Sequence, residues 1–248
     1  MKRTVVIVQA RFGSSRLPGK VMLSLGGKTV LRRVLDRCQQ IKNAVDVCCA
    51  ISETKDSDVV ADEALKAGAH VYRGSETDVL ARYYWAAKML NADVILRVTS
   101  DCPLLDPAVC DRLLELRDET EADYACNNMP SSWPHGLDCE AVPLMWLERA
   151  YLEATASFER EHVMPFIRNH PDAKKVNLSC PEEGLKEHRW TLDTPRDLEF
   201  MQSIFEHLKE GRENWDWRVP LELVRANPTL SLLNSGEVTP SRIKASGK

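Results

Sequence analysis

The sequence has no long apolar segment, no excess of positive charge and no pair of cysteines at a metal-binding spacing. Its first apolar run, residues 5–8, is too short for a signal peptide and far too short to span a membrane. The net charge is −4 at pH 7, whereas nucleic-acid-binding domains usually carry a basic footprint. We therefore expect a cytoplasmic protein with no nucleic-acid or membrane partner.

Cysteine is present, but not in a disulfide or zinc pattern. None of the eight cysteines belongs to a Cys-x-x-Cys pair, and three lie in apolar runs. They are predicted to be reduced, buried thiols and not a disulfide framework. At 248 residues, with 44% hydrophobic and 28% charged residues, the chain fits one large globular domain, with room for a small appendage.

Two common nucleotide-binding motifs are also missing. A Walker A loop has four residues between its glycines and a hydroxyl residue after its lysine. Here five residues separate Gly13 from Gly19, and Val21 follows Lys20. No Gly-x-Gly-x-x-Gly fingerprint occurs either. These absences argue against a P-loop NTPase and against a dinucleotide-binding domain.

The first loop of the chain has the composition of a phosphate-binding turn. Residues 10–20 follow a strand-like apolar run, precede a helical pattern, and combine glycines and serines with Arg11, Arg16 and Lys20. Glycines let the backbone approach a ligand, free N–H groups point at an anion, and the cations supply charge. The loop is predicted to bind a polyanion; an ordinary basic surface turn is the alternative.

Strands and helices alternate four times in the first half of the chain. This alternation, with short connections, predicts an α/β fold with a parallel sheet and helices on both faces. Ligands of such sheets bind beyond the carboxyl ends of the strands, where the basic loop and Asp101 both lie. The predicted strands are 5–8, 45–51, 69–72 and 94–98, and the predicted helices are 29–41, 56–67, 77–90 and 107–119.

The second half of the chain is less regular. Residues 127–137 are rich in Asn, Ser, Pro and Gly and are predicted to be a loop. A polar, basic composition predicts a flexible tail over 236–248. Further strands are predicted at 139–142, 173–178 and 187–192, and further helices at 145–155, 159–169, 195–209 and 218–227.

The first loop resembles the signature loop of the nucleotidyltransferases that make CMP-activated sugar acids. These include the CMP-Kdo and CMP-sialate (acylneuraminate) synthetases, and the most similar branch is that of the SpsF-like cytidylyltransferases of spore coat polysaccharide biosynthesis. The pattern that carries the resemblance is Ala10-Arg11-x-Gly13-Ser14-x-Arg16-Leu17-Pro18-x-Lys20. The resemblance implies a three-layer, GT-A-like fold of the nucleotide-diphospho-sugar transferases with a small inserted β/α region, and a homodimer.

The resemblance also implies a reaction. CMP would pass from CTP to a sugar acid or related polysaccharide-precursor acceptor, pyrophosphate would leave, and Mg²⁺ would be the cofactor. Residues 1–235 would form the nucleotidyltransferase domain, with 133–170 for acceptor binding and dimerisation. The alternatives are a GT-A-type glycosyltransferase that uses a nucleotide sugar and a catalytically silent nucleotide-binding protein. The glycosyltransferase should carry an Asp-x-Asp motif, but Ser100 and Cys102 flank Asp101.

Asp101 and Asp193 are the predicted Mg²⁺ ligands. Asp101 ends an apolar strand and is followed by Cys102 and Pro103, which make a sharp, fixed turn. A carboxylate at this place, close to a triphosphate, would be a suitable Mg²⁺ ligand. Asp193 lies in a Leu-Asp-Thr-Pro turn, and the resembling family carries a metal-binding aspartate at both places. The residues alone leave open a plain turn aspartate at 101 and a helix N-cap at 193. The predicted catalytic residues are Arg11, Lys20 and Asp101.

The remaining site predictions follow the resemblance and the charge pattern. The predicted nucleotide contacts are Ala10, Arg11, Gly13, Ser14, Arg16, Lys20, Arg73, Ser75, Asp78 and Ser100. The predicted acceptor contacts are His135, Asp138, Glu140, Arg160 and Arg189. Arg73 and Ser75 are candidates for cytosine recognition, with helix capping near Ser75 as the alternative. Surface or intersubunit salt bridges are the alternative for Arg160 and Arg189.

Overall fold

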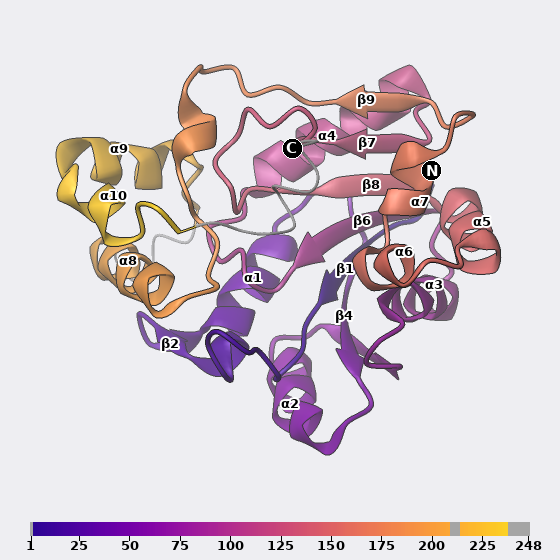
Figure 1. The fold of residues 1–248 in the computed structure, drawn as a ribbon, viewed down its shortest axis with the longest axis horizontal. Helices are drawn as coiled ribbons and strands as arrows, with labels where there is room; N and C mark the ends of the chain where they lie inside the picture. The colour runs from indigo at the N-terminus through magenta and orange to yellow at the C-terminus, as the bar shows by residue number, and fades with distance from the viewer. Residues whose placement is uncertain (1, 209–213, 238–248) are drawn as a thin grey trace.

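A seven-stranded sheet organises the protein (Figure 1). The computed structural model describes residues 2–208 and 214–237, so positions 238–248 of the predicted tail lie outside the described residues. The strand order is β5-β4-β1-β6-β8-β7-β9; β8 runs antiparallel to β6 and β7, and the other neighbours are parallel, which confirms the predicted mostly parallel sheet. The strands are β1 (Thr4–Gln9), β4 (Asp46–Ser52), β5 (His70–Gly74), β6 (Val94–Thr99), β7 (Tyr124–Cys126), β8 (Glu140–Pro143) and β9 (Lys175–Asn177).

The central strand β1 separates two apolar cores. Alternate side chains of a strand point to opposite faces, so Val6 and Val8 join one core while Val5 and Ile7 join the other. Because both faces are covered, this strand is a continuous apolar run in the sequence. Helices α1 (Val30–Cys38), α2 (Asp58–Lys66) and α4 (Pro107–Thr120) pack on the first face, and α3 (Val79–Met89), α5 (Leu144–Glu153) and α7 (Pro165–Asn169) on the second.

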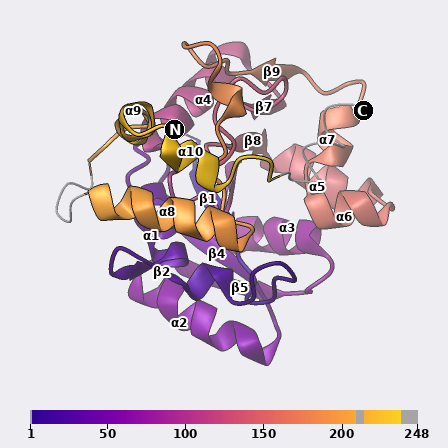
Figure 2. The same ribbon diagram turned by 60° about the vertical axis from the view of Figure 1, so that its left-hand side comes forward.

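The C-terminal helices form a third apolar core beside the sheet (Figure 2). Trp133 and Trp190 belong to this core and tie the loops before β8 and α8 to it. No helix within residues 2–208 and 214–237 is long and apolar enough to cross a membrane. The elements that contribute to this core are α8 (Pro195–His207), α9 (Arg218–Ala226), α10 (Thr229–Leu233) and the hairpin of β2 (Ser24–Leu25) and β3 (Lys28–Thr29).

A capping box fixes the start of α8. The side chain of Thr194 accepts a hydrogen bond from the N–H of Asp197, and the Asp197 carboxylate accepts one from the N–H of Thr194. Pro195 occupies the first helical position, where its missing N–H costs nothing. Thr194 is therefore the N-cap, and Asp193 is not, so its carboxylate remains available for a site.

Residues 159–169 form two short helices, so the prediction of one helix is wrong. Helix α6 (Ser157–His162) ends before Val163, whose φ is 70°, and α7 begins at Pro165. The positive φ of Val163 ends α6, and Pro165, which lacks an N–H, occupies the first position of α7, where that group would have no helical partner. His162 and Arg168, on either side of the break, both line the cleft described below.

The strand predicted at 187–192 is also wrong. This segment follows a 3-10 turn and makes only an isolated bridge, between His135 and Arg189, and no ladder with the main sheet in the described part of the chain. The N–H of Trp190 donates to the carbonyl oxygen of His135 at 2.6 Å. Gly136 permits this close crossing, because a Cβ there would lie 2.1 Å from the Trp190 oxygen. The 3-10 turns are Lys20–Met22, Lys55–Ser57 and Leu185–Glu187.

The inserted β/α region and the cysteines complete the fold. The region 133–170 contains β8, which lies between β6 and β7, so part of it belongs to the main sheet. Helices α5, α6 and α7 of the same region lie together at one side of the sheet (Figure 1). All eight cysteines are free, as predicted, and seven are buried; Cys180 is half-buried, which differs from the prediction.

Candidate active site

Lys20 lies between two carboxylates at the carboxyl edge of the sheet. Its Nζ is 2.9 Å from Oδ2 of Asp101, which follows β6, and 2.8 Å from Oδ1 of Asp193, which precedes α8. Nζ also donates to the carbonyl oxygen of Leu192 at 2.9 Å. Gly19 turns the chain into this position with a φ of 67°, a left-handed conformation that favours glycine. The basic loop therefore meets both predicted metal ligands.

These three charges stabilise one another. Burial alone would raise the pKa of Asp101, but the Lys20 ammonium and a 2.5 Å hydrogen bond from Oγ1 of Thr99 hold it well below its usual range. Burial would lower the pKa of Lys20, but Asp101 and Asp193 raise it above its usual value. Asp101 and Lys20 are therefore both charged at neutral pH and provide fixed charges, not a proton-transfer pair.

Asp193 contacts two further cations. A guanidinium nitrogen of Arg16, in the basic loop, lies 3.2 Å from its Oδ2, and one of Arg189 lies 3.4 Å away. Arg189 is itself held by Asp197 through two hydrogen bonds of 2.8 Å, and the Asp197 side chain is fully buried. Arg16 is half-exposed, so a ligand can reach it. Arg189 thus anchors the turn that carries Asp193.

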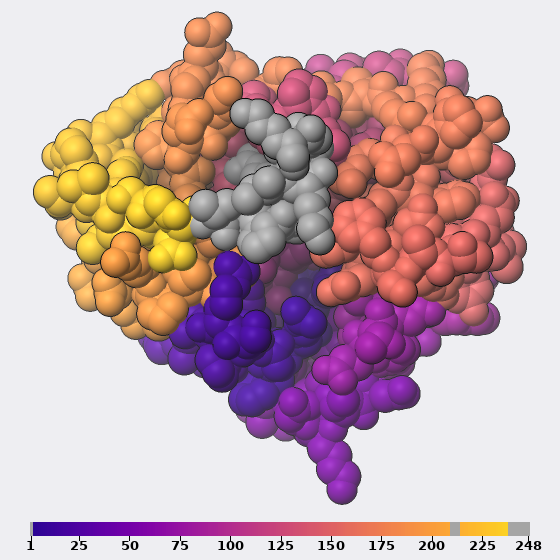
Figure 3. Space-filling model, in the orientation of Figure 1, coloured from indigo at the N-terminus to yellow at the C-terminus, as the bar shows by residue number. Residues whose placement is uncertain are grey.

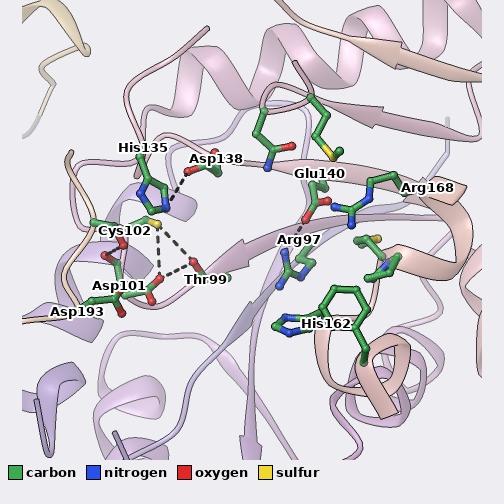
Figure 4. A pocket seen from close by; sticks show the side chains of 16 residues that line it. Arg97, Thr99, Asp101, Cys102, His135, Asp138, Glu140, His162, Arg168 and Asp193 are labelled. Atoms are coloured by element: carbon green, nitrogen blue, oxygen red, sulfur yellow. Dashed lines mark hydrogen bonds and ion pairs between the residues drawn. The ribbon is translucent and has the colours of Figure 1, made fainter. Parts of the chain in front are cut away.

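A cleft of about 210 Å³ opens beside this charge cluster. Figure 4 shows Asp101, Asp193 and His135 at one end and Arg97 and Arg168 at the other. The lining is therefore acidic near Lys20 and carries cations at the far end. Apolar lining side chains are Met129, Phe158, Met164 and Pro165.

The two arginines at the far end of the cleft differ in their partners. Arg97 pairs with Oε2 of Glu140 at 2.5 Å, and Oε1 of Glu140 accepts a hydrogen bond from the Tyr124 hydroxyl at 2.5 Å. Within the described residues, the side chain of Arg168 has no ion pair or hydrogen bond, and its Nε is buried. Asn128 also has a buried, unpartnered Oδ1 in this lining. The far end of the cleft therefore contains buried polar atoms, among them Nε of Arg168 and Oδ1 of Asn128, that have no hydrogen-bond partner within the described residues.

Most residues predicted for the nucleotide lie around this edge. Arg11 and Gly13 are exposed in the loop, and a Cβ on Gly13 would meet no atom of the described residues within 4 Å. Figure 3 shows this N-terminal segment, in indigo, between the C-terminal helices and the salmon segment around α5 to α7. Ser14 is half-buried, and Ala10 and Ser100 are buried. Three predicted acceptor residues, His135, Asp138 and Glu140, line the cleft.

Arg73 and Arg160 are not brought to the cleft. Arg73 pairs at 2.7 Å with Asp58 of α2, and their side chains are 38% and 66% exposed. Arg160 pairs with Asp78, which is the N-cap of α3. Ser75 accepts a hydrogen bond from the N–H of Asp78 at 3.1 Å, so it supports the same turn. Arg160 and Arg189 thus both form ion pairs within this chain, and the pairs of Arg189 are buried, whereas the predicted alternative was a surface or intersubunit salt bridge.

Two arginines near the site, Arg97 and Arg168, were not singled out from the sequence. Arg97 interrupts the apolar run of β6, and a charge inside such a run was the available signal. Arg168 carried no signal, because residues 159–169 were predicted as one continuous helix. The break before Pro165 places Arg168 in the cleft lining.

Asp101 and Asp193 are the residues that could hold a divalent metal. No group of three or more His, Cys, Asp or Glu side chains in the described ranges is arranged to hold a metal ion by itself. Mg²⁺ is often bound by one or two carboxylates, with substrate phosphates and water completing the shell. Two carboxylates that share one ammonium ion therefore suit a metal that binds together with a nucleotide.

This chain is similar to cytidylyltransferases and to a spore coat polysaccharide biosynthesis protein. A family model described as cytidylyltransferase matches residues 5–214. The spore coat polysaccharide biosynthesis protein SpsF of Bacillus subtilis is 31% identical over 241 residues, covering 94% of this chain and 95% of SpsF. A 3-deoxy-manno-octulosonate cytidylyltransferase of Alcanivorax borkumensis is 34% identical over 108 residues, covering 44% of this chain and 43% of that protein. A solved cytidylyltransferase from Leptospira borgpetersenii is 29% identical, covers 96% of this chain and 99% of its own, and has a TM-score of 0.88. This chain therefore belongs to the cytidylyltransferase family.

Proposed function

We propose that this protein transfers the CMP group of CTP to an anionic sugar acceptor, a sugar acid or a related polysaccharide precursor, and releases pyrophosphate. The observation that carries this proposal is the Lys20 ammonium held between Asp101 and Asp193, below a basic loop and beside a cleft. Family membership supports the transfer of a cytidylyl group. The cations at the far end of the cleft support an acidic acceptor.

The basic loop would bind the triphosphate. The α-phosphate is shielded by its own negative oxygens, so attack on it requires cations nearby. Arg11 and Arg16 are exposed and can reach phosphate oxygens, and the Lys20 ammonium has three N–H donors. When bound, Mg²⁺ lowers this repulsion and stabilises the leaving pyrophosphate. Asp101 and Asp193 would hold it, and Lys20 would then bond phosphate oxygens.

The cleft would bind the acceptor. Its acidic end adjoins the phosphate site, so a hydroxyl placed there is close to the α-phosphate. Arg168, at the other end, has no partner for its charge within the described residues. A guanidinium matches a carboxylate or phosphate through two parallel N–H donors. Arg168 would therefore hold the acidic group of the acceptor and orient its hydroxyl.

Pyrophosphate release tests this function. The wild-type protein, with CTP and Mg²⁺, is assayed against 3-deoxy-manno-octulosonate, N-acetylneuraminate and glucose. We expect release that requires CTP and an acidic sugar. Asp101→Asn should abolish it, whereas Asp172→Asn, at an exposed surface carboxylate, should retain it. Release with glucose and with neither acidic sugar would contradict the acceptor class.

Assembly and location are part of the same proposal. A homodimer through the region 133–170 and a cytoplasmic location remain predictions from the sequence. The exposed apolar side chains Met145, Leu152 and Phe158 lie in this region. Sedimentation of the wild-type protein at micromolar concentration should give the mass of two chains. A single-chain mass would contradict the homodimer and leave the reaction unaffected.

A further inference from the structure

Glu140 lies at the far end of the cleft, and other side chains bind both of its carboxylate oxygens. It is the register partner of Arg97 on the neighbouring antiparallel strand. Its Oε2 pairs with Nη1 of Arg97, and its Oε1 accepts a hydrogen bond from the Tyr124 hydroxyl, each at 2.5 Å. The Glu140 side chain is only 6% exposed. Apolar residues often replace a buried ion pair without loss of stability, so stability alone does not explain this pair.

Arg97 and Glu140 form an ion pair whose charges cancel. Burial alone would lower the pKa of Arg97, but the Glu140 carboxylate raises it above its usual value. Burial and the same carboxylate raise the pKa of the Tyr124 hydroxyl well above its usual value, so this phenol stays neutral and donates its hydrogen bond. The pair therefore adds one positive and one negative charge to this end of the cleft.

Arg168 carries the charge that no carboxylate of the described residues balances. Its Nε is buried without a hydrogen-bond partner in this part of the chain, and so is Nε of Arg97. Figure 4 shows both guanidinium groups beside Glu140. The other carboxylates of the cleft lining lie at the loop end, beside Lys20 or His135. Two guanidinium groups and one carboxylate leave the far end with a net charge of +1.

We infer that Glu140 selects the charge of the acidic group that the acceptor presents to Arg168. Because Glu140 neutralises Arg97, one positive charge remains, and a monoanionic carboxylate balances it. A dianionic phosphomonoester would bring a second negative charge into a buried site and against the Glu140 carboxylate. Glu140 therefore favours sugar acids and rejects sugar phosphates through an unfavourable contact with the wrong ligand. This inference rests on the proposed function, in which Arg168 holds the acidic group.

Three hexoses that differ in the group at C6 test the inference on the wild-type protein. Glucuronate carries a monoanionic carboxylate, glucose 6-phosphate a dianionic phosphate, and glucose 6-sulfate a monoanion with the shape of the phosphate. Ligand-observed NMR titrations measure the three affinities at about pH 8. At this pH a phosphomonoester is doubly charged, and an imidazole, such as that of His162 at the same end of the cleft, is ordinarily neutral.

The ranking of the three affinities decides between charge and shape. We expect glucuronate and glucose 6-sulfate to bind at least about tenfold more tightly than glucose 6-phosphate, because like charges oppose only the dianion. Equal affinities, weak binding of both sulfate and phosphate, or no binding of any of the three would overturn the inference. Arg168→Met should lose most of the affinity for glucuronate, and unchanged affinity would place the ligands elsewhere and also overturn it.

Two variants test Glu140 itself. Glu140→Gln raises the net charge of the far end to +2, so the preference should shift at least about tenfold towards glucose 6-phosphate. The double variant Arg97→Gln/Glu140→Gln returns the net charge to +1 and should restore the wild-type ranking. Glu148→Gln is the control, because Glu148 also accepts a hydrogen bond from a tyrosine, Tyr84, at 2.7 Å, but does not line the cleft. A wild-type ranking in Glu140→Gln, or a double variant that behaves like Glu140→Gln, would contradict selection by charge.

Thermal melts and pyrophosphate release separate this role from its alternatives. Glu140→Gln removes one partner of a buried pair and should lower the melting temperature, but a purely structural pair would leave the ranking of the ligands unchanged. If Glu140→Gln does not fold, the wild-type ranking and the double variant decide. Pyrophosphate release with an acidic sugar, together with equal affinities for the three hexoses, would overturn only the inference. No release with any acidic sugar would overturn the proposed function as well.

Discussion

Lys20, at one end of the cleft, and Arg168, at the other, differ in whether a carboxylate of the described residues pairs with them. At the loop end, the Lys20 ammonium lies within 2.9 Å of carboxylate oxygens of both Asp101 and Asp193. At the far end, Arg168 has a buried guanidinium nitrogen without an acceptor in the described residues. Paired charges hold the geometry of a site at little net cost in stability. Buried charges without a partner in the protein are found where a ligand supplies the opposite charge. Pairing, and not the presence of charge, separates the two kinds of residue here.

Removing the paired cation should have the largest effect. Lys20→Met leaves the Asp101 and Asp193 carboxylates without the cation they share, so we expect turnover to fall by about 10²–10³-fold and the melting temperature to fall as well. Pyrophosphate release and thermal melts measure both. Lys66→Met, at an exposed lysine at the end of α2, is the control. Activity within a few-fold of wild type would contradict the role of Lys20.

Arg189 should affect stability more than acceptor binding. Arg189→Met leaves the buried Asp197 carboxylate without its bidentate partner, which should cost about 3–5 kcal/mol of unfolding free energy. The acceptor KM of the folded variant should stay near that of wild type. Arg225→Met, at an arginine paired with the exposed Glu182, should cost less than about 1 kcal/mol. A rise in acceptor KM without loss of stability would restore Arg189 as an acceptor ligand.

Removing the unpaired cation of the cleft should act on one substrate only. Arg168→Met should raise the KM of the acidic acceptor about tenfold, because a charged hydrogen-bonding partner is lost, and should leave CTP affinity unchanged. Steady-state kinetics with each substrate varied in turn distinguishes these effects. Arg149→Met, on the surface of α5, serves as the control. An equal effect on both substrates would contradict an acceptor role.

The smallest expected effect is on acid stability. Burial raises the pKa of Asp101, but the Lys20 ammonium outweighs this effect, so the pKa is depressed in the folded state. The Asp101 carboxylate therefore makes its full contribution to the free energy of unfolding above the pKa of the unfolded chain, about 4. That contribution is lost as the pH falls from about 4 through the lower folded pKa. The melting-temperature difference between wild type and Asp101→Asn should therefore narrow between pH 5 and pH 3. A constant difference would show that the carboxylate charge does not stabilise the fold.

The fold and the loop end of the site were predictable from the sequence, because their signals are local. The apolar run of β1, the Gly/Ser-rich basic loop and the turn at Asp101 each appear within a few neighbouring residues. The partners of Arg160 and Arg189 were not predictable, because capping and ion pairing depend on which turns meet in space. The segment 187–192 has the composition of a strand, but its close crossing at Gly136 decides its path.

Nucleotide binding to the wild-type protein is the most direct test of CMP transfer from CTP. Calorimetry measures the affinity for CTP, UTP, GTP and ATP, each with and without Mg²⁺, and so compares the four bases under the same conditions. A clear preference for CTP that strengthens with Mg²⁺ is the predicted result, because the basic loop and the carboxylate pair would then act on one ligand. Preference for another nucleotide, or no binding of any, would contradict it.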